Sequence, residues 1–351
     1  MKINSFNYKK LNLILLITLI IFSFISYAIG IADITFKDAM NVLLTEIPFF
    51  RDKIDISNVK NGHLIILKNL RFPRVLLSII IGAGLSVVGG VFQGLFKNPL
   101  AEPYILGISS GASLFATIAI IFESEYVFLI FSGASLFAII GALVSVLLVI
   151  IISSRFNSDS SINSIPSIML LLSGISVGLF FDSIATVMIS VNTEKIKSIT
   201  LWGMGSFQTA TWEKVFITFP SILLCIIIIN FFARHINVIS IGDNDAQNLG
   251  IDVKKSKIIL VILSSIVVAL SVASSGVIGF VGLIIPNLLR GIIGADYRKL
   301  LKTSALCGGL FLLFCDTIGR MILPFSEIPV GSITAFIGAP FFLYIIIKGN
   351  K

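Results

Sequence analysis

Long apolar runs separated by short polar segments make up most of this chain. Each run comes close to the roughly 20 residues that an α-helix needs to cross the hydrocarbon core of a bilayer. The strands of a membrane barrel would be shorter and would alternate apolar and polar residues. We therefore predict an all-α, polytopic membrane protein with about ten transmembrane helices in a single domain over residues 1–351. The predicted spans are 11–31, 72–96, 104–122, 126–152, 165–190, 212–233, 256–274, 277–293, 300–320 and 330–347.

The composition agrees with a protein embedded in a lipid bilayer. Of the 351 residues, 56% are hydrophobic and 13% are charged, whereas soluble proteins carry roughly 25% charged residues. The net charge of +8 indicates a basic cytoplasmic face rather than a nucleic-acid partner. The first apolar run is longer than the apolar core of a signal peptide, so we expect it to remain as a span. Cleavage near Ser26–Ala28 is the alternative.

The distribution of Lys and Arg residues favours an orientation with both termini in the cytoplasm. In that orientation the cytoplasmic segments hold 15 of the 26 basic residues, and cytoplasmic loops usually carry the excess. Two connections are long: an outer loop over residues 32–71, polar enough to form a small structured cap, and an inner loop over residues 234–257. In the inner loop, Asp243 or Asn244 would be the capping residue before a short helix that Gly250 would end. Docking of a soluble partner and a plain solvated loop both fit this spacing.

The stretch that begins at Arg71 has a small-residue pattern typical of close helix packing. Arg71 and Arg74 share one face of a helix because they are three residues apart, and Pro73 fits its first turn. Asn98 and Pro99 end this helix, because proline disfavours helical geometry in the preceding residue. Small residues recur every four positions and let another helix approach closely in lipid, or line a translocation pathway; they are Gly82, Ser86, Gly90 and Gly94.

Few polar side chains lie inside the predicted spans, and each is a candidate functional residue because insertion into lipid is costly. Asp182 and Asp316 are the carboxylates clearly within spans. Asp316 precedes Arg320 by four residues, so the two can form an ion pair on one helix; a proton or sodium relay is the alternative for either aspartate. Three uncharged polar residues lie near helix breaks, where they would line a pathway or, as we favour, satisfy freed backbone groups: Gln93, Asn98 and Asn287.

A weak internal symmetry relates the two halves of the chain. Asn98-Pro99 breaks a glycine-rich region early in the sequence, and Pro286-Asn287 breaks another one late. With five spans in each half, the two halves would be inverted relative to each other, which is a recurring design of transporters.

The sequence shows no pattern for enzyme chemistry. The two histidines, His63 and His235, fall in loops on opposite sides of the membrane, and neither a metal cluster nor a nucleophile with a base is visible. The glycine-rich segment from Gly107 to Ser113 lacks the lysine of a phosphate loop. We therefore expect no catalytic residue, no metal site and no cofactor. If the protein uses ATP, another chain must bind it.

A series of short motifs extends over about residues 10–348. They are Arg71–Arg74, Gly82–Leu85, Gly89–Gln93, Asn98–Pro103, Leu106–Ala112, Leu201–Gly205, Ala246–Gly250, Gly279–Asn287, Asp316–Arg320, Glu327–Gly331 and Gly338–Pro340. In this order the motifs resemble those of the membrane permeases of ABC importers for iron–siderophore complexes, haem and cobalamin. The combination is specific, although single motifs are not.

That resemblance implies a homodimer of ten-helix subunits in a bacterial cytoplasmic membrane, with the pathway between the subunits. Two ATPase subunits would dock on the cytoplasmic side and an extracytoplasmic substrate-binding protein on the other. Arg71, Arg74 and Arg320 match the positions that engage acidic residues of the binding protein in this family. The motif of the coupling helix, which sits in the ATPase cleft, is matched by Ala246, Leu249, Gly250 and Ile251.

The function that the resemblance implies is import of an iron chelate (siderophore or haem) or of cobalamin, powered by separate ATPase subunits. The binding protein selects the cargo in such systems, so the sequence leaves the chelate open. The alternative is a secondary transporter that couples to an ion gradient through Asp182 or Asp316.

Overall fold

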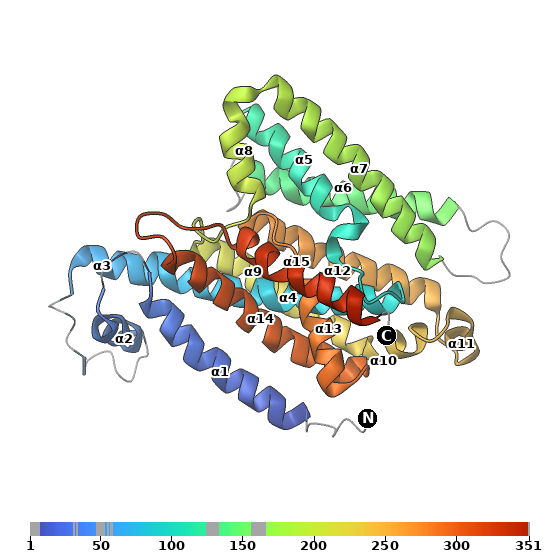
Figure 1. Ribbon diagram of the computed structural model, residues 1–351, viewed down its shortest axis with the longest axis horizontal. Helices are drawn as coiled ribbons and strands as arrows, with labels where there is room; N and C mark the ends of the chain where they lie inside the picture. The colour runs from blue at the N-terminus through green and yellow to red at the C-terminus, as the bar shows by residue number, and fades with distance from the viewer. Residues whose placement is uncertain are drawn as a thin grey trace.

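The computed structural model of the chain describes residues 8–30, 32, 34–46, 53–54, 56, 59–123, 133–155 and 166–349. These residues form helices joined by short connections, and they contain no β-strand (Figure 1). The elements are α1 (Tyr8–Ala28), α2 (Phe36–Thr45), α3 (Asn61–Ile65), the π-helical turn η1 (Ile66–Arg71), α4 (Phe72–Leu95), the 3-10 turn η2 (Pro103–Leu106), α5 (Ile108–Ile121), α6 (Gly133–Arg155), α7 (Ser167–Val191), the 3-10 turn η3 (Thr193–Lys195), α8 (Ile196–Gly203), α9 (Trp212–Phe231), α10 (Ala233–Ile239), α11 (Asp243–Asn248), α12 (Val253–Ser275), α13 (Val281–Ile293), α14 (Tyr297–Met321) and α15 (Val330–Gly349).

Ten of these helical segments correspond to the ten predicted spans. Within the described residues, seven helices are long and apolar enough to cross a membrane: α1, the continuous helix Asn61–Leu95, α6, α7, α9, α12 and α14. Three shorter apolar helices complete the set, at Ile108–Ile121, Val281–Ile293 and Val330–Leu343. The prediction of an all-α protein with about ten transmembrane helices is confirmed. The first residues of the predicted span 126–152, up to residue 132, lie outside the described residues.

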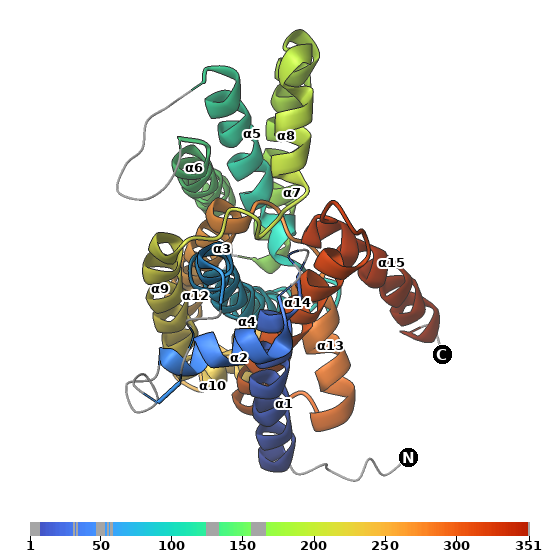
Figure 2. The same ribbon diagram turned by 90° about the vertical axis from the view of Figure 1, so that its left-hand side faces the viewer.

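Helix α4 lies at the centre of the molecule, and α1, α9, α12, α13 and α14 surround it (Figure 2). Almost all of its side chains are buried. A Cβ atom on Gly82 would overlap the carbonyl oxygen of Gly308 on α14. A Cβ atom on Gly90 would lie 3.0 Å from the side chain of Leu301, which is also on α14. The small residues of α4 therefore bring its backbone against that of α14, a contact that larger side chains would prevent.

The predicted start at residue 72 coincides with the start of α4, but the helix continues on its N-terminal side, so that one continuous helix extends over Asn61–Leu95. Residues 61–71, expected in the outer loop, form α3 and the wider turn η1. Pro73 explains the wider turn, since in a regular helix its ring clashes with the preceding turn and it has no N–H to donate. In the π-helical register the carbonyl left free belongs to Lys68, and the indole N–H of Trp212 on α9 donates to it at 2.9 Å.

Folded structure is also present in the rest of the predicted outer loop. Helix α2 begins where the side chain of Thr35 accepts a hydrogen bond from the backbone N–H of Asp38. It buries Ala39 and Val42 in a small apolar cluster to which α1 and η1 contribute. The expectation of a structured segment within residues 32–71 therefore holds for its described part.

The predicted inner loop, residues 234–257, is mostly helical. It contains nearly all of α10, the short helix α11 and the start of α12. Gly242, rather than Asp243 or Asn244, is the residue that precedes the first turn of α11. Figure 1 places α2 and α3 at one end of the long axis and α11 at the opposite end. We call these the α2 end and the α11 end.

Candidate functional site

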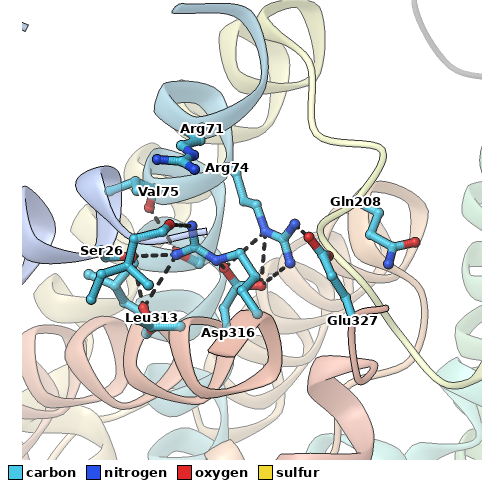
Figure 3. A network of polar contacts seen from close by, with 12 residues as sticks. Ser26, Arg71, Arg74, Val75, Gln208, Leu313, Asp316 and Glu327 are labelled. Carbon is cyan, nitrogen blue, oxygen red and sulfur yellow. Dashed lines mark hydrogen bonds and ion pairs between the residues drawn. The ribbon is translucent and has the colours of Figure 1, made fainter. Parts of the chain in front are cut away.

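Buried charged side chains gather at the α2 end, between α4, α14 and the connection that follows α14 (Figure 3). Arg74 of α4 donates to Asp316 of α14, with Nε–carboxylate distances of 3.1 and 3.0 Å and an Nη2–Oδ1 distance of 2.7 Å. Arg74 also pairs with Glu327 at 2.7 Å. The Nε atom of Arg320, one helical turn after Asp316, lies 3.2 Å from Oδ2 of the same carboxylate. The predicted Asp316–Arg320 ion pair is confirmed, and Arg74 is a second partner that its position in the sequence does not reveal.

Arg71 and Arg320 tie the end of α1 to α4 and α14. Arg71 donates to the carbonyl oxygen of Ala28 at 2.6 Å, and Arg320 donates to that of Ile29 at 2.8 Å and to the hydroxyl of Ser26 at 2.6 Å. The last carbonyl groups of a helix have no partner within the helix and carry partial negative charge. The two guanidinium groups therefore stabilise the end of α1 and fix its position in the bundle.

A cavity of about 360 Å³ opens beside these arginines, lined by all three of them and by Glu327 and Gln208 among others. Three guanidinium groups face two carboxylates here, so the lining has an excess of positive charge. Arg71 contacts backbone carbonyls and no carboxylate among the described residues. The side chains of these arginines are buried, since Arg71, Arg74 and Arg320 are only 5%, 8% and 4% exposed. Burial of a charge requires paired and hydrogen-bonded neighbours, and this requirement turns the arginines inward.

The α11 end carries the residues that match the coupling helix. The N–H of Ile251 donates to the carbonyl of Ala246 at 2.9 Å, and the N–H of Gly250 donates to that of Gln247 at 2.8 Å. Together these two bonds form a Schellman motif, which requires a left-handed residue and favours glycine there. Gly250 has a φ of +80°. The predicted end of this helix at Gly250 is confirmed.

Two apolar side chains project from α11 and the turn before it. Leu249 is 70% exposed and Ile241 is 76% exposed, whereas Ala246 between them is fully buried. Ala246 therefore attaches α11 to the body of the protein, while Leu249 and Ile241 offer apolar surface to a neighbouring molecule. The coupling-helix motif of the sequence includes Leu249 but not Ile241, and only the fold shows that both side chains are exposed.

Gln93 replaces a backbone donor that α13 lacks. Pro286 has no N–H, so the carbonyl of Gly282, four residues earlier, has no partner within the helix. The side-chain amide of Gln93 on α4 donates to this carbonyl at 3.1 Å. Arg290 in turn donates to the amide oxygen of Gln93 at 3.0 Å. These bonds join α4 to α13 at the break in the shorter helix.

Asn287 and Asn98 also hydrogen-bond to the backbone near helix breaks. The amide of Asn287 donates to the carbonyl of Pro99 at 2.7 Å, and the side-chain oxygen of Asn98 accepts from the N–H of Leu100 at 2.9 Å. Arg290 donates to the oxygen of Asn287 at 3.0 Å. The contacts of Gln93, Asn98 and Asn287 agree with the interpretation that they satisfy freed backbone groups.

Asp182 is the intramembrane carboxylate that lies outside the arginine cluster. It is on an exposed face of α7 and accepts a hydrogen bond from the hydroxyl of Ser110 on α5 at 3.0 Å. Ser183 and Thr186 beside it donate to carbonyl groups of their own helix. A carboxylate in contact with lipid is costly, so this face of α7 is suited to water, to a cargo molecule or to another protein chain.

Comparison with known proteins shows which family has a sequence similar to this chain. Residues 17–348 match the FecCD transport family. The hemin transport system permease protein HmuU of Yersinia pestis is 34% identical over 284 residues, which is 81% of this chain and 83% of HmuU. The molybdate import system permease protein MolB of Haemophilus influenzae is 34% identical over 344 residues, covering 97% of this chain and 96% of MolB.

A solved structure agrees with this match. It is described as an inward-facing conformation of a metal-chelate type ABC transporter, and it superposes with a TM-score of 0.80 at 31% sequence identity. The superposition covers 97% of this chain and 99% of that one. The similarity therefore extends over the arginine cluster, the broken helices and α11 alike.

Proposed function

Because the chain belongs to the FecCD transport family, we propose that it is the permease subunit of an ATP-binding-cassette importer that moves an iron chelate or cobalamin into the cytoplasm. The observation that supports this proposal is the contrast between the opposite ends of one membrane bundle. The α2 end has a cavity with excess positive charge, and the α11 end has exposed apolar side chains on a short helix. We assign the α2 end to the extracytoplasmic side and the α11 end to the cytoplasm, with both termini there.

At the outer end, the cavity beside Arg71, Arg74 and Arg320 would receive an acidic side chain of the substrate-binding protein. Asp316 and Glu327 already neutralise much of the charge of Arg74 and Arg320, so Arg71 is the cation with the most charge left to offer. Electrostatic complementarity of this kind steers association and fixes the register of two proteins. Substitution of Arg71 by Gln should slow association with the binding protein and weaken its dependence on salt. An unchanged association rate at low salt would rule out the cavity as the docking site.

At the inner end, α11 would sit in a cleft of the ATPase subunit, held mainly by Leu249 and Ile241. Buried apolar anchors of this kind supply most of the binding energy in protein interfaces. Two copies of the chain, with two ATPase subunits, would place the exposed face of α7 and Asp182 along the pathway between them. ATP-driven closure of the ATPase subunits would move the two α11 helices and switch the pathway from outward-open to inward-open.

The cargo is best identified by competition between labelled and unlabelled compounds for uptake, because the names of the relatives give different cargoes. We expect uptake of a labelled ferric siderophore, haem or cobalamin by cells that carry the complete importer, and inhibition of that uptake by an excess of only one of the three unlabelled compounds. Molybdate belongs in the same panel as an anionic competitor. Inhibition by molybdate alone would overturn the assignment to chelates while leaving the importer class intact.

The alternative, a secondary transporter driven by an ion gradient, has lost one of its two candidate residues. Asp316 is 1% exposed and lies between Arg74 and Arg320, so its access to ions is low. Asp182 is the residue on which that alternative now depends. An Asp182→Asn variant that still transports, without any dependence on an ion gradient, would remove it.

A further inference from the structure

A buried lysine connects the coupling helix to the interior of the membrane bundle. Lys257, in the second turn of α12, is 1% exposed, and its Nζ lies 2.5 Å from Oδ2 of Asp243. Asp243 is the first residue of α11. In the sequence, Lys257 belongs to a run of basic residues that reads as a solvated cytoplasmic surface. The fold instead places its ammonium group beneath α11.

The same ammonium group also reaches α7. Lys257 Nζ donates to the hydroxyl of Ser167 at 3.0 Å, and Ser167 is the first residue of α7. The hydroxyl of Ser167 donates to the carbonyl of Leu95, the last residue of α4, at 2.7 Å. One continuous set of contacts therefore extends from α11 through α12 to the start of α7 and the end of α4. We call Asp243, Lys257 and Ser167 the Lys257 bridge.

A second lysine holds Asp243 from the other side. Lys97, in the connection after α4, lies 3.2 Å from Oδ1 of Asp243, and its side chain is 37% exposed. Burial raises the pKa of Asp243, but the hydrogen bonds and charges of Lys257 and Lys97 outweigh it and hold the pKa below its ordinary value. Asp243 is therefore ionised at neutral pH, and both of its oxygens face ammonium groups.

The bridge is important for α11 because this helix has only six residues. Helices shorter than about 12–15 residues are marginal by themselves, so their position depends on what they contact. Ala246 provides a small buried apolar contact on one side of α11, and Asp243 provides the charged contact at its start. A force applied to the exposed Leu249 would thus be transmitted mainly through Ala246 and Asp243.

We propose that Lys257 is a positioning residue that transmits movement of α11 to the start of α7, and so links ATP hydrolysis in the partner subunits to opening of the pathway. This inference rests on the proposed function of the chain as an importer permease. α7 carries Asp182 on its exposed face, so a displacement at Ser167 is a displacement of the helix that would border the pathway. Loss of the bridge should leave ATP hydrolysis running with much less transport per ATP.

The test uses the complete importer, with its ATPase subunits and binding protein, reconstituted in lipid vesicles. Four variants are compared with the wild type: Lys257→Met, Asp243→Asn, the double variant, and Lys257→Arg. Lys302→Met is the matched control, because it makes the same substitution at an exposed position in the second turn of α14. Thermal unfolding, ATP hydrolysis and cargo uptake are measured for each, and uptake is expressed per ATP hydrolysed.

Asp243→Asn removes the carboxylate beside the buried ammonium of Lys257, and Lys257→Met removes the buried ammonium beside Asp243 while Lys97 stays. Both should lower thermal stability as well as transport, Asp243→Asn more strongly. The double variant removes both buried charges of the bridge, and the ammonium group of Lys97 that faced Asp243 is partly exposed to solvent, so most of the stability should return. Its uptake per ATP should nevertheless stay about tenfold below the wild type, a typical size for coupling between two sites. Lys257→Arg, which keeps a charge able to pair with Asp243, should restore part of the coupling, and Lys302→Met should match the wild type.

Recovery of uptake per ATP in the double variant, together with its stability, would show that the bridge has only a structural role and would overturn the proposal. A wild-type complex without any ATP-driven uptake would instead refute the proposed function, on which the bridge depends. The wild-type measurement and the ratio of variant to wild type therefore separate the two failures.

Discussion

Removing the charge of Asp316 tests whether the arginine cluster holds the α2 end together. In Asp316→Asn, one carboxylate oxygen becomes an amide N–H₂ that faces the N–H groups of Arg74 and Arg320. Arg74 keeps its contact with Glu327 at 2.7 Å, and Arg320 keeps its bonds to Ile29 and Ser26. Two buried guanidinium groups then share one carboxylate. Breaking a buried ion pair from one side typically costs about 3–5 kcal/mol, and we expect a loss of free energy of unfolding in this range.

The measurement is reversible unfolding of the purified protein in mixed detergent micelles as the fraction of denaturing detergent rises. Glu327→Gln is the matched control, because it removes the other carboxylate from the same arginine. The side chain of Glu327 is 16% exposed against 1% for Asp316, and it makes one contact with Arg74 rather than several. We expect the control to cost clearly less than Asp316→Asn. Equal stabilities for Asp316→Asn and the wild type would refute the view that this buried cluster ties α1, α4 and α14 together.

Three further substitutions test the packing of α4, the docking of α11 and the exposed face of α7. Gly82→Ala places a methyl group against the carbonyl of Gly308 and should cost about 1–3 kcal/mol in the same unfolding assay; Gly62→Ala, which has open space around it, should cost nothing, and equal effects would contradict the packing argument. Leu249→Ser should leave stability unchanged but lower the amount of ATPase subunit that co-purifies with the chain by about fivefold, as for an interface anchor. Full retention of the ATPase subunits would exclude α11 as their docking site. Asp182→Lys reverses the charge on the exposed face of α7 and should raise uptake of anionic relative to cationic chelates, whereas an unchanged ratio would place Asp182 away from the cargo.

Most of the transmembrane architecture was predictable from the sequence, because the thickness of the bilayer sets the length of each apolar run. The continuation of the helix from α4 back to Asn61 was not. Lys68, Asn69 and Arg71 made residues 61–71 look like a loop, yet the helix continues through them. It does so because Trp212, 144 residues further along the chain, supplies the hydrogen bond that Pro73 cannot make. No local pattern contains that information.

The arginine cluster was predictable only in part. The spacing of Asp316 and Arg320 indicated an ion pair on one helix, and this pair exists. The contact between Arg74 and Asp316 spans 242 positions in the sequence, and it holds the Arg74 side chain inside the bundle. A usable signal was nevertheless present, since an aspartate within a membrane span needs a nearby cation. The role of these arginines in receptor docking stays a prediction.

The α11 end shows the same limit. Gly250 and the end of the short helix followed from the preference for glycine in a left-handed position. Lys257 did not, because a basic residue next to the cytoplasm is usually solvated, and its burial depends on the meeting of α7, α11 and α12. Sequence spacing therefore predicted the short helix and its end, while its connection to the bundle required the fold. The inverted relation of the two five-span halves stays a prediction.

ATP-driven uptake into proteoliposomes is the most direct test of whether this chain is the permease subunit of an ABC importer. The complete importer is reconstituted with the binding protein and labelled chelate outside and ATP inside, or with the arrangement reversed for the opposite orientation. We predict uptake that requires both ATP and the binding protein, and that continues when ionophores dissipate all ion gradients. Uptake that persists without ATP, and stops when the ion gradient is removed, would contradict the assignment of this chain as an ABC importer permease.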